Sequence, residues 1–154
     1  MKPVQQQLTG WITEVIKGTE IKVGDPESPV LNHINNEEDR KVVTGEKTLN
    51  ISDKVSFKRK IFQTIESTPY VKLQDGLYTL TAKIKNSKGF TRLEMYAECN
   101  GKISSYNIEK ENTFWKTISI SNLRVRAGKV EIGFLAEGTA NAFCYVDDVS
   151  LVKK

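Results

Sequence analysis

The sequence predicts an all-β protein, a β-sandwich of jelly-roll type, that forms one domain over residues 1–154. Apolar and polar residues alternate in one segment after another, as they do in strands with one buried face. Turn signals separate these segments at intervals of roughly 8–12 residues, which is the spacing typical of sandwiches and barrels. No segment shows a sustained helical period. A domain of this length can bury roughly 70% of its unfolded surface, so it needs no disulfide bonds for stability.

The clearest pair of strands lies in the middle of the chain. In residues 77–85 the even-numbered side chains, from Tyr78 to Ile84, are apolar, and most of the others are threonine or lysine. Residues 92–99 repeat this alternation. The Asn100-Gly101 pair that follows predicts a tight hairpin into a return strand over residues 102–108.

Further strands and loops follow from the same reasoning. Strands are expected at residues 11–16, 20–23, 48–51, 55–65, 114–120, 129–135 and 143–152. Residues 32–40 are rich in asparagine and acidic side chains, so a polar loop is expected there. Neither a linker nor an internal repeat divides the chain.

Composition and charge narrow the functional classes. No apolar run approaches the ~18 residues that a membrane span requires, so no membrane partner is expected. The first residues have no apolar stretch behind their lysine, as a signal peptide would, so the protein is cytosolic or the chain is part of a longer protein. Net charge is only +4, from 23 basic and 19 acidic residues, with the two signs interleaved.

The densest basic spot is Lys58-Arg59-Lys60, between Phe57 and Phe62. Aromatic side chains within a basic surface can stack on the bases of single-stranded nucleic acid, and this is the first interpretation. The second is a solvated strand face on which lysine discourages edge pairing. We expect no nucleic-acid partner.

Catalytic and zinc chemistry find little support. The adjacent pair Asp147 and Asp148 points to opposite faces of a strand, so the two carboxylates cannot line one cleft as glycoside hydrolysis requires. His33 is the only histidine and lies near no nucleophile motif. Zinc needs three or four nitrogen or sulfur ligands, and an inventory of one histidine and two cysteines does not favour such a site. Cys99 and Cys144 lie in apolar strand patterns and are interpreted as buried thiols, with a disulfide left open. We therefore expect no enzyme activity.

Asp147 shares its strand parity with Val149 and Leu151, so the alternation places its carboxylate toward the core. A buried carboxylate must be paired, hydrogen-bonded or bound to a metal. Calcium, which accepts carboxylate and backbone carbonyl oxygens, is one partner, and loop amides are the other.

Several stretches of the chain resemble a known family in their order and spacing. They are Thr44 to Leu49, Gln63-Thr64-Ile65, Asp75 to Lys85, Asn112-Thr113-Phe114-Trp115, Val130 to Phe134 and Ala140 to Leu151. The chain is similar there to the calcium-containing jelly-roll carbohydrate-binding modules of plant-cell-wall hydrolases. Within that group it most resembles the galactan-binding modules (family 61) attached to endo-β-1,4-galactanases.

This resemblance implies a structural calcium ion. Its ligands would be the Asp147 side chain and main-chain carbonyls in the segment from Gly45 to Lys47. It also implies a covalently linked catalytic domain, secretion and an extracellular workplace. One departure is that no Asn-x-Gly-Phe-Glu segment, whose glutamate helps to bind calcium in such modules, precedes Trp11.

A sugar-binding site needs an exposed aromatic platform beside polar groups that bond the ring hydroxyls. Tyr96 is such a candidate because its strand face also carries Arg92 and Glu94, although the same pattern fits a tyrosine without a ligand. Lys83 joins this face if its strand pairs with residues 92–99. The remaining candidates are Phe90, as a loop platform or tucked beneath the loop; Trp115, because it or Phe114 must face outward; and Asn141, as a ligand contact or a turn residue.

The expected function is therefore that of a monomeric, non-catalytic module that binds β-1,4-galactan and targets an attached glycoside hydrolase. Two alternatives remain: a basic domain that binds single-stranded nucleic acid, and a structural β-domain that packs on a catalytic partner.

Overall fold

The computed structural model describes residues 12–18, 31–33, 47–67, 69, 73–108, 110–126 and 128–154. Within these ranges the chain forms strands and turns, and no helix there is long and apolar enough to cross a membrane. The strands are β1 (Ile12–Lys17), β2 (Leu31–His33), β3 (Lys47–Ser52), β4 (Phe57–Glu66), β5 (Gly76–Asn86), β6 (Phe90–Cys99), β7 (Lys102–Asn107), β8 (Asn112–Val125), β9 (Lys129–Gly138) and β10 (Phe143–Lys153).

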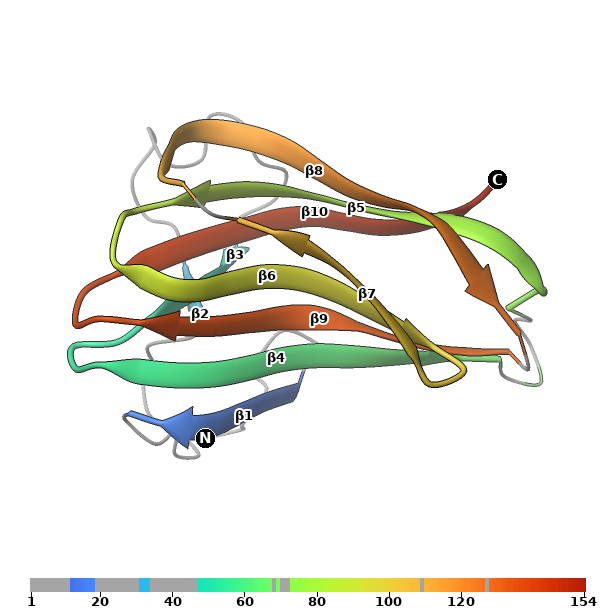
Figure 1. Ribbon diagram of the computed structural model, residues 1–154, viewed down its shortest axis with the longest axis horizontal. Helices are drawn as coiled ribbons and strands as arrows, with labels where there is room; N and C mark the ends of the chain where they lie inside the picture. The colour runs from blue at the N-terminus through green and yellow to red at the C-terminus, as the bar shows by residue number, and fades with distance from the viewer. Residues whose placement is uncertain are drawn as a thin grey trace.

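The strands form two five-stranded antiparallel sheets that pack face to face (Figure 1). The first sheet has the order β1-β4-β9-β6-β7, and the second has the order β2-β3-β10-β5-β8. From β3 to β6, and again from β7 to β10, consecutive strands alternate between the two sheets. This repeated crossing is a jelly roll, and the predicted fold class is confirmed.

The core fills the space between the sheets, and its composition follows from the alternation in the sequence. On β5, Tyr78, Leu80, Ala82 and Ile84 are all buried, and on β6 the side chains of Leu93, Met95, Ala97 and Cys99 meet them from the other sheet. Burying a leucine, isoleucine or methionine side chain contributes about 1.5–3 kcal/mol each, so this interdigitated layer is the main stabilising element.

The boundaries and pairing of some strands differ from the prediction. Strand β8 continues to Val125, five residues beyond the predicted end at residue 120. The expected polar loop at residues 32–40 begins within a strand, because Leu31–His33 pairs with β3. Residues 34–40, Trp11 and the expected strand at residues 20–23 lie outside the described residues. The Asn100-Gly101 hairpin is confirmed, and both residues have the positive φ angles, 52° and 81°, that a tight two-residue turn requires.

Both cysteines are buried free thiols, as predicted. Cys99 faces the core from the first sheet, beside the β6–β7 hairpin, and pairs with Lys102. Cys144 faces the core from the second sheet and pairs with Asn86, beside the turn at the opposite end of the sandwich. Burial raises the pKa of each thiol, which disfavours the reactive thiolate.

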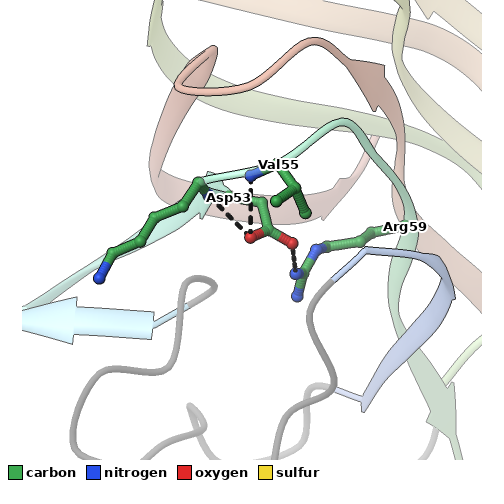
Figure 2. A network of polar contacts seen from close by, with 4 residues as sticks. Asp53, Val55 and Arg59 are labelled. Atoms are coloured by element: carbon green, nitrogen blue, oxygen red, sulfur yellow. Dashed lines mark hydrogen bonds and ion pairs between the residues drawn. The ribbon is translucent and has the colours of Figure 1, made fainter.

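One ion pair lies inside the sandwich, between β4 and the β3–β4 turn, and Figure 2 shows it from close by. Arg59 on β4 is 0% exposed and Asp53 in the β3–β4 turn is 4% exposed. Arg59 Nη2 donates to Asp53 Oδ2 at 2.6 Å, while Asp53 Oδ1 accepts the amides of Lys54 at 2.7 Å and Val55 at 3.4 Å. Burial lowers the pKa of Arg59, and the hydrogen bond and charge of Asp53 oppose that shift.

This pair changes the interpretation of the basic cluster at residues 58–60. Arg59 points into the core, whereas Lys58 and Lys60 are on the opposite side of the strand and only half-buried. Lys60 Nζ lies 3.3 Å from Glu131 Oε2, so one of the two outward charges is already balanced. The stretch therefore does not present the continuous basic surface that nucleic-acid binding through it would need.

We expect Asp53→Asn to lower the free energy of unfolding by about 3–5 kcal/mol, because it leaves the charge of Arg59 buried without its counter-ion. Urea unfolding followed by circular dichroism measures the loss. Adding Arg59→Met to this variant should recover much of it, because the buried charge is then removed as well. The exposed Lys54→Ala is the control and should change stability by no more than about 0.5 kcal/mol. A loss below about 1 kcal/mol for Asp53→Asn would contradict the dependence of Arg59 on Asp53.

Candidate functional site

The candidate site lies at one edge of the sandwich, where β7 and β8 form the outermost strands of the two sheets and contact each other. Near the start of β8 this seam opens into a hollow of about 290 Å³, which we call the Tyr106 hollow. Its lining comes from β7, from the connection to β8 and from β8 itself. The residues are Tyr106, Asn107, Ile108, Lys110, Glu111, Asn112, Lys116 and Ile118, with Ile84 of β5 behind them.

A bulge in β8 shapes the rim of this hollow. Ile84 pairs with Lys116 and Asn86 pairs with Asn112, so the three residues 113–115 of β8 oppose the single residue between Ile84 and Asn86. Extra residues in one strand disrupt the ladder locally and redirect side chains, and such bulges are over-represented at sheet edges and beside functional sites. Phe114 lies within this bulge, and it is 83% exposed.

Two asparagines fix the connection between β7 and β8. Asn86 is buried at 3% exposure, and its Oδ1 accepts a hydrogen bond from Asn112 Nδ2 at 2.9 Å. The side-chain amides of Asn86 and Asn112 also donate to the carbonyl of Lys110, at 3.2 and 3.1 Å. The Ile108 amide donates to the carbonyl of Leu93 at 2.8 Å. These bonds hold the polar rim in place beside Phe114, so the hollow is built into the edge of the sheet.

The chemistry of the hollow is that of a binding surface. Tyr106 packs partly against the core, and Lys116 Nζ lies 6.0 Å from the centre of its ring. Exposed amide and charged groups from Asn107, Lys110 and Glu111 surround the aromatic floor. An aromatic surface with a few convergent polar groups is typical of small-molecule sites. It suits a ligand with an apolar face and a hydroxylated rim.

Tyr96 is not the exposed platform that the alternation predicts. Its side chain is on the outer face of the first sheet, but the residue is only 3% exposed, and its Oη donates to Glu131 Oε2 at 2.6 Å. The physical reason is Gly133 on the neighbouring strand, where an added Cβ would lie 2.8 Å from the Tyr96 ring. The ring therefore settles beside Gly133, and Lys60 Nζ approaches it at 5.8 Å. Burial, followed by the bond to Glu131, raises the pKa of the Tyr96 phenol.

Arg92 and Glu94 share the outer face with Tyr96, as predicted, but they bond to each other. Arg92 Nε and Nη2 donate to the two carboxylate oxygens of Glu94 at 3.2 and 3.0 Å. This hydrogen bond raises the pKa of Arg92. The two polar groups are therefore largely satisfied within the strand.

Lys83 does not lie on the face that carries Arg92, and that prediction is wrong. Strand β5 pairs with β8 and β10, while β6 pairs with β7 and β9, so the turn between β5 and β6 carries the chain from one sheet to the other. Lys83 is on the outer face of the second sheet, where its Nζ lies 3.5 Å from Asp148 Oδ2.

Three further predicted residues have positions that the alternation left open. Phe90 tucks against the core, with its ring edge-to-face to Phe57 at 6.0 Å. Trp115 follows Phe114 in the β8 bulge and is half-buried; its Nε1 is buried and has no hydrogen-bond partner among the described residues. Asn141 forms the β9–β10 turn with φ of 67°, and its amide donates to the carbonyl of Asp53 at 2.8 Å.

Asp147 does not point toward the core with Val149 and Leu151, because a bulge separates them. Asp147 pairs with Lys83 and Ser150 with Thr81, so two residues of β10 oppose one of β5, and Asp148 takes φ of 49°. The bulge reverses the parity, so that Val149 and Leu151 pack on the core while Asp147 is opposite Lys83 on the outer face. Asp147 Oδ1 accepts the Asp148 amide at 2.8 Å.

The described residues include no group of three or more histidine, cysteine, aspartate or glutamate side chains that could hold a metal ion. Calcium needs six to eight oxygen ligands, and Asp147 supplies a single carboxylate. The predicted carbonyl ligand at Gly45 lies outside the described residues, and Lys47 begins β3 beside the strand that carries Asp147. The structure therefore describes only part of the calcium ligand set that the family resemblance implies.

The second sheet carries another aromatic surface, whose two rings sequence reasoning did not bring together. The rings of Phe143 and Tyr145 on β10 are 4.8 Å apart, tilted by 34°, and both side chains are half-buried. Tyr145 pairs with Lys85 on one side and Asn50 on the other, which places it on the outer face. Like Tyr106, Tyr145 belongs to a strand that the alternation identified. The pattern within a single strand does not show which side chains of other strands lie beside it.

No protein-family model and no curated protein matches the sequence. Solved structures match by fold. TmCBM61 in complex with β-1,4-galactotriose has a TM-score of 0.72 at 19% identity, covering 97% of this chain and 92% of that chain. A carbohydrate-binding module of the β-sandwich superfamily, described for promiscuous specificity, has a TM-score of 0.59 at 12% identity, covering 99% of this chain and 60% of that chain.

A third similar structure combines a binding module with a catalytic one. It is the CBM22-1–GH10 part of endo-1,4-β-D-xylanase 10B from Clostridium thermocellum, complexed with xylohexaose. Its TM-score is 0.55 at 14% identity, covering 94% of this chain and 26% of that chain. The chain thus has the jelly-roll fold of carbohydrate-binding modules, as the resemblance in its sequence predicted.

Proposed function

We propose that the protein is a non-catalytic carbohydrate-binding module that binds β-1,4-galactan at the Tyr106 hollow. As part of a longer, secreted protein, it would hold an attached glycoside hydrolase close to plant-cell-wall polysaccharide. The module itself would act as a monomer and perform no chemistry.

The observation that carries the proposal is the 83% exposed Phe114 in the β8 bulge, between Asn112 and Lys116, which both line the Tyr106 hollow. Pyranose rings have an apolar face of C–H groups and a rim of hydroxyls. Phe114 and Tyr106 offer aromatic surface for the first, and the exposed side chains of Asn107, Lys110 and Glu111 offer polar groups for the second. Because the hollow is shallow and buries little of a ligand, we expect modest affinity.

Comparison with known folds supports the choice of ligand and partner. TmCBM61 has the same fold and was solved with β-1,4-galactotriose, and the xylanase module is joined to a glycoside hydrolase domain. These likenesses concern fold, so the galactan ligand, the attached hydrolase and secretion are parts of the proposal.

Calorimetric titration with β-1,4-galactotriose tests the function, with cello-, xylo- and mannotriose as controls. We expect saturable binding of the galactotriose alone. Phe114→Ala should weaken it by about 10- to 100-fold, because burying a phenylalanine contributes about 1.5–3 kcal/mol. No heat with any trisaccharide would refute the proposed function.

Tyr145→Ala and Val152→Ala are the matched controls for location. Tyr145 belongs to the aromatic surface on the outer face of the second sheet, and Val152 is an apolar side chain that is 59% exposed. Both variants should bind galactotriose as the parent does. If Tyr145→Ala abolishes binding and Phe114→Ala does not, the site lies on the sheet face and the assignment to the edge is wrong.

The calcium ion is a further prediction, which rests on the family resemblance. We expect EDTA to lower the melting temperature by several degrees, because a ligand bound only by the folded state stabilises it. Asp147→Asn should remove this difference. Asp148→Asn should keep it, because the Asp148 carboxylate is already ion-paired with Lys83 Nζ at 3.5 Å. Equal melting temperatures of the parent chain in calcium and in EDTA would contradict a structural calcium ion.

A further inference from the structure

A second hollow lies on the same seam, at the opposite end of β7. It has a volume of about 430 Å³ and lies between the β6–β7 hairpin and the end of β8. We call it the Lys102 hollow. Its polar lining is Lys102, Ser104, Arg124, Arg126, Asn100 and Asn122, over an apolar floor of Leu77, Cys99 and Leu123.

The charge of this lining is entirely positive. Three cationic side chains contribute to it and no carboxylate does. Lys102, Arg124 and Arg126 are exposed, and none of them belongs to the ion pairs found among the described residues. Cationic side chains that line a hollow without a counter-ion attract an anionic ligand.

The backbone holds this lining in a defined shape. Tyr78 pairs with Leu123 and Leu80 with Ile120, so two residues of β8 oppose one of β5 in a second bulge. Asn122, within that bulge, has φ of 59°, and Asn100 across the seam has φ of 52° in the tight hairpin. One asparagine is therefore held by a strand bulge and the other by a tight turn, on the two sides of the hollow.

The two hollows share one strand. Lys102, Ser104 and Tyr106 alternate along β7 and pair with Cys99, Ala97 and Met95, so they are on the same side of that strand. Tyr106 lies four residue steps along the strand from Lys102, which is roughly 13 Å. A short oligosaccharide that lies along the seam would reach both hollows.

We propose that the Lys102 hollow is a second subsite, which binds a negatively charged sugar unit of the glycan held at the Tyr106 hollow. This inference rests on the proposed function, because it takes the ligand to be a glycan. Guanidinium groups bind carboxylate and sulfate through paired, charge-assisted hydrogen bonds, and the asparagine amides and the Ser104 hydroxyl suit the neighbouring sugar hydroxyls. The natural ligand would thus be an acidic galactan, bearing uronate or sulfate ester groups.

A sugar anion fits this hollow better than a nucleic-acid strand. Single-stranded nucleic acid needs aromatic side chains along a basic groove for base stacking. The Lys102 hollow has no aromatic lining residue, and the basic stretch at residues 58–60 turns its arginine into the core.

Amide-resolved NMR titration of the whole chain tests this inference, with galacturonic acid, galactose 6-sulfate, galactose and β-1,4-galactotriose as separate probes. We expect either acidic sugar, or both, to shift the amide signals of Asn100, Asn122 and Ser104. Galactose should leave these three signals unchanged. Galactotriose should shift Asn107 and Asn112, which report on the Tyr106 hollow. Comparing the two acids tells whether uronate or sulfate is preferred.

Arg124→Ala/Arg126→Ala should weaken binding of the acidic sugar by about tenfold or more, because two charge-assisted contacts are removed. Lys54→Ala/Lys88→Ala is the matched control, since it removes two exposed cations elsewhere and should leave binding intact. Raising the salt concentration from about 0.05 to about 0.5 M should weaken the acidic sugar far more than galactotriose.

Three outcomes would overturn the inference. If neither acid shifts Asn100 or Asn122 while galactotriose still shifts Asn107 and Asn112, the inference fails and the proposed function stands. If no sugar shifts any signal, both fail. If a short oligothymidylate shifts the signals of the Lys102 hollow and binds more tightly than the acidic sugars, the hollow is a nucleic-acid site.

Discussion

The buried ion pair between Arg59 and Asp53 joins separate parts of the sandwich at one end. The Asp53 carboxylate bonds the amides of its own turn, and its backbone carbonyl accepts the amide of Asn141 from the β9–β10 turn. Gly18, at the end of β1, approaches so closely that an added Cβ would lie 2.6 Å from Asp53 Oδ2. Removing two charges from water costs several kcal/mol per ion, so the arrangement is stable only because good geometry and added hydrogen bonds offset that cost.

The same end of the molecule supports the candidate binding edge. Asn86 ends β5 beside Cys144 and bonds Asn112, while Ser87 bonds Phe143 at the start of β10 through both its amide and its hydroxyl. The rim of the Tyr106 hollow is thus tied by short hydrogen bonds to strands in the centre of the second sheet. A ligand that docks there meets a surface that is largely preformed, which reduces the entropy lost on binding.

The sequence predicted which face of a strand is buried much better than which strands and side chains lie beside it. Alternation correctly predicted which side chains of β5 and β6 fill the core, because burial of one face imposes a period of two. It could not predict that β5 and β6 belong to different sheets, which separates Lys83 from Arg92. Nor could it predict that Gly133 gives Tyr96 a place to lie, since that depends on the side chain across the ladder.

Bulges account for most of the remaining differences between the predicted and the observed side-chain orientations. One in β10 reverses the parity after Asp147, and one in β8 exposes Phe114 instead of Trp115. A bulge with one extra residue, like the one in β10, shifts every later residue to the opposite face, so a single irregularity misplaces a whole run of expectations. The residues of the Tyr106 hollow come from three strands, β5, β7 and β8, and from the β7–β8 connection, and only the pairing of the sheets brings them together.

The two bulges in β8 also bear on how molecules of this protein behave toward one another. Strand β8 is fourteen residues long and forms an edge of its sheet, so an unbroken backbone ladder there would invite a strand from another copy to add to it. Its two irregularities interrupt the row of amide and carbonyl groups near both ends of the strand. The distortions that open hollows for a ligand therefore protect the open edge against aggregation.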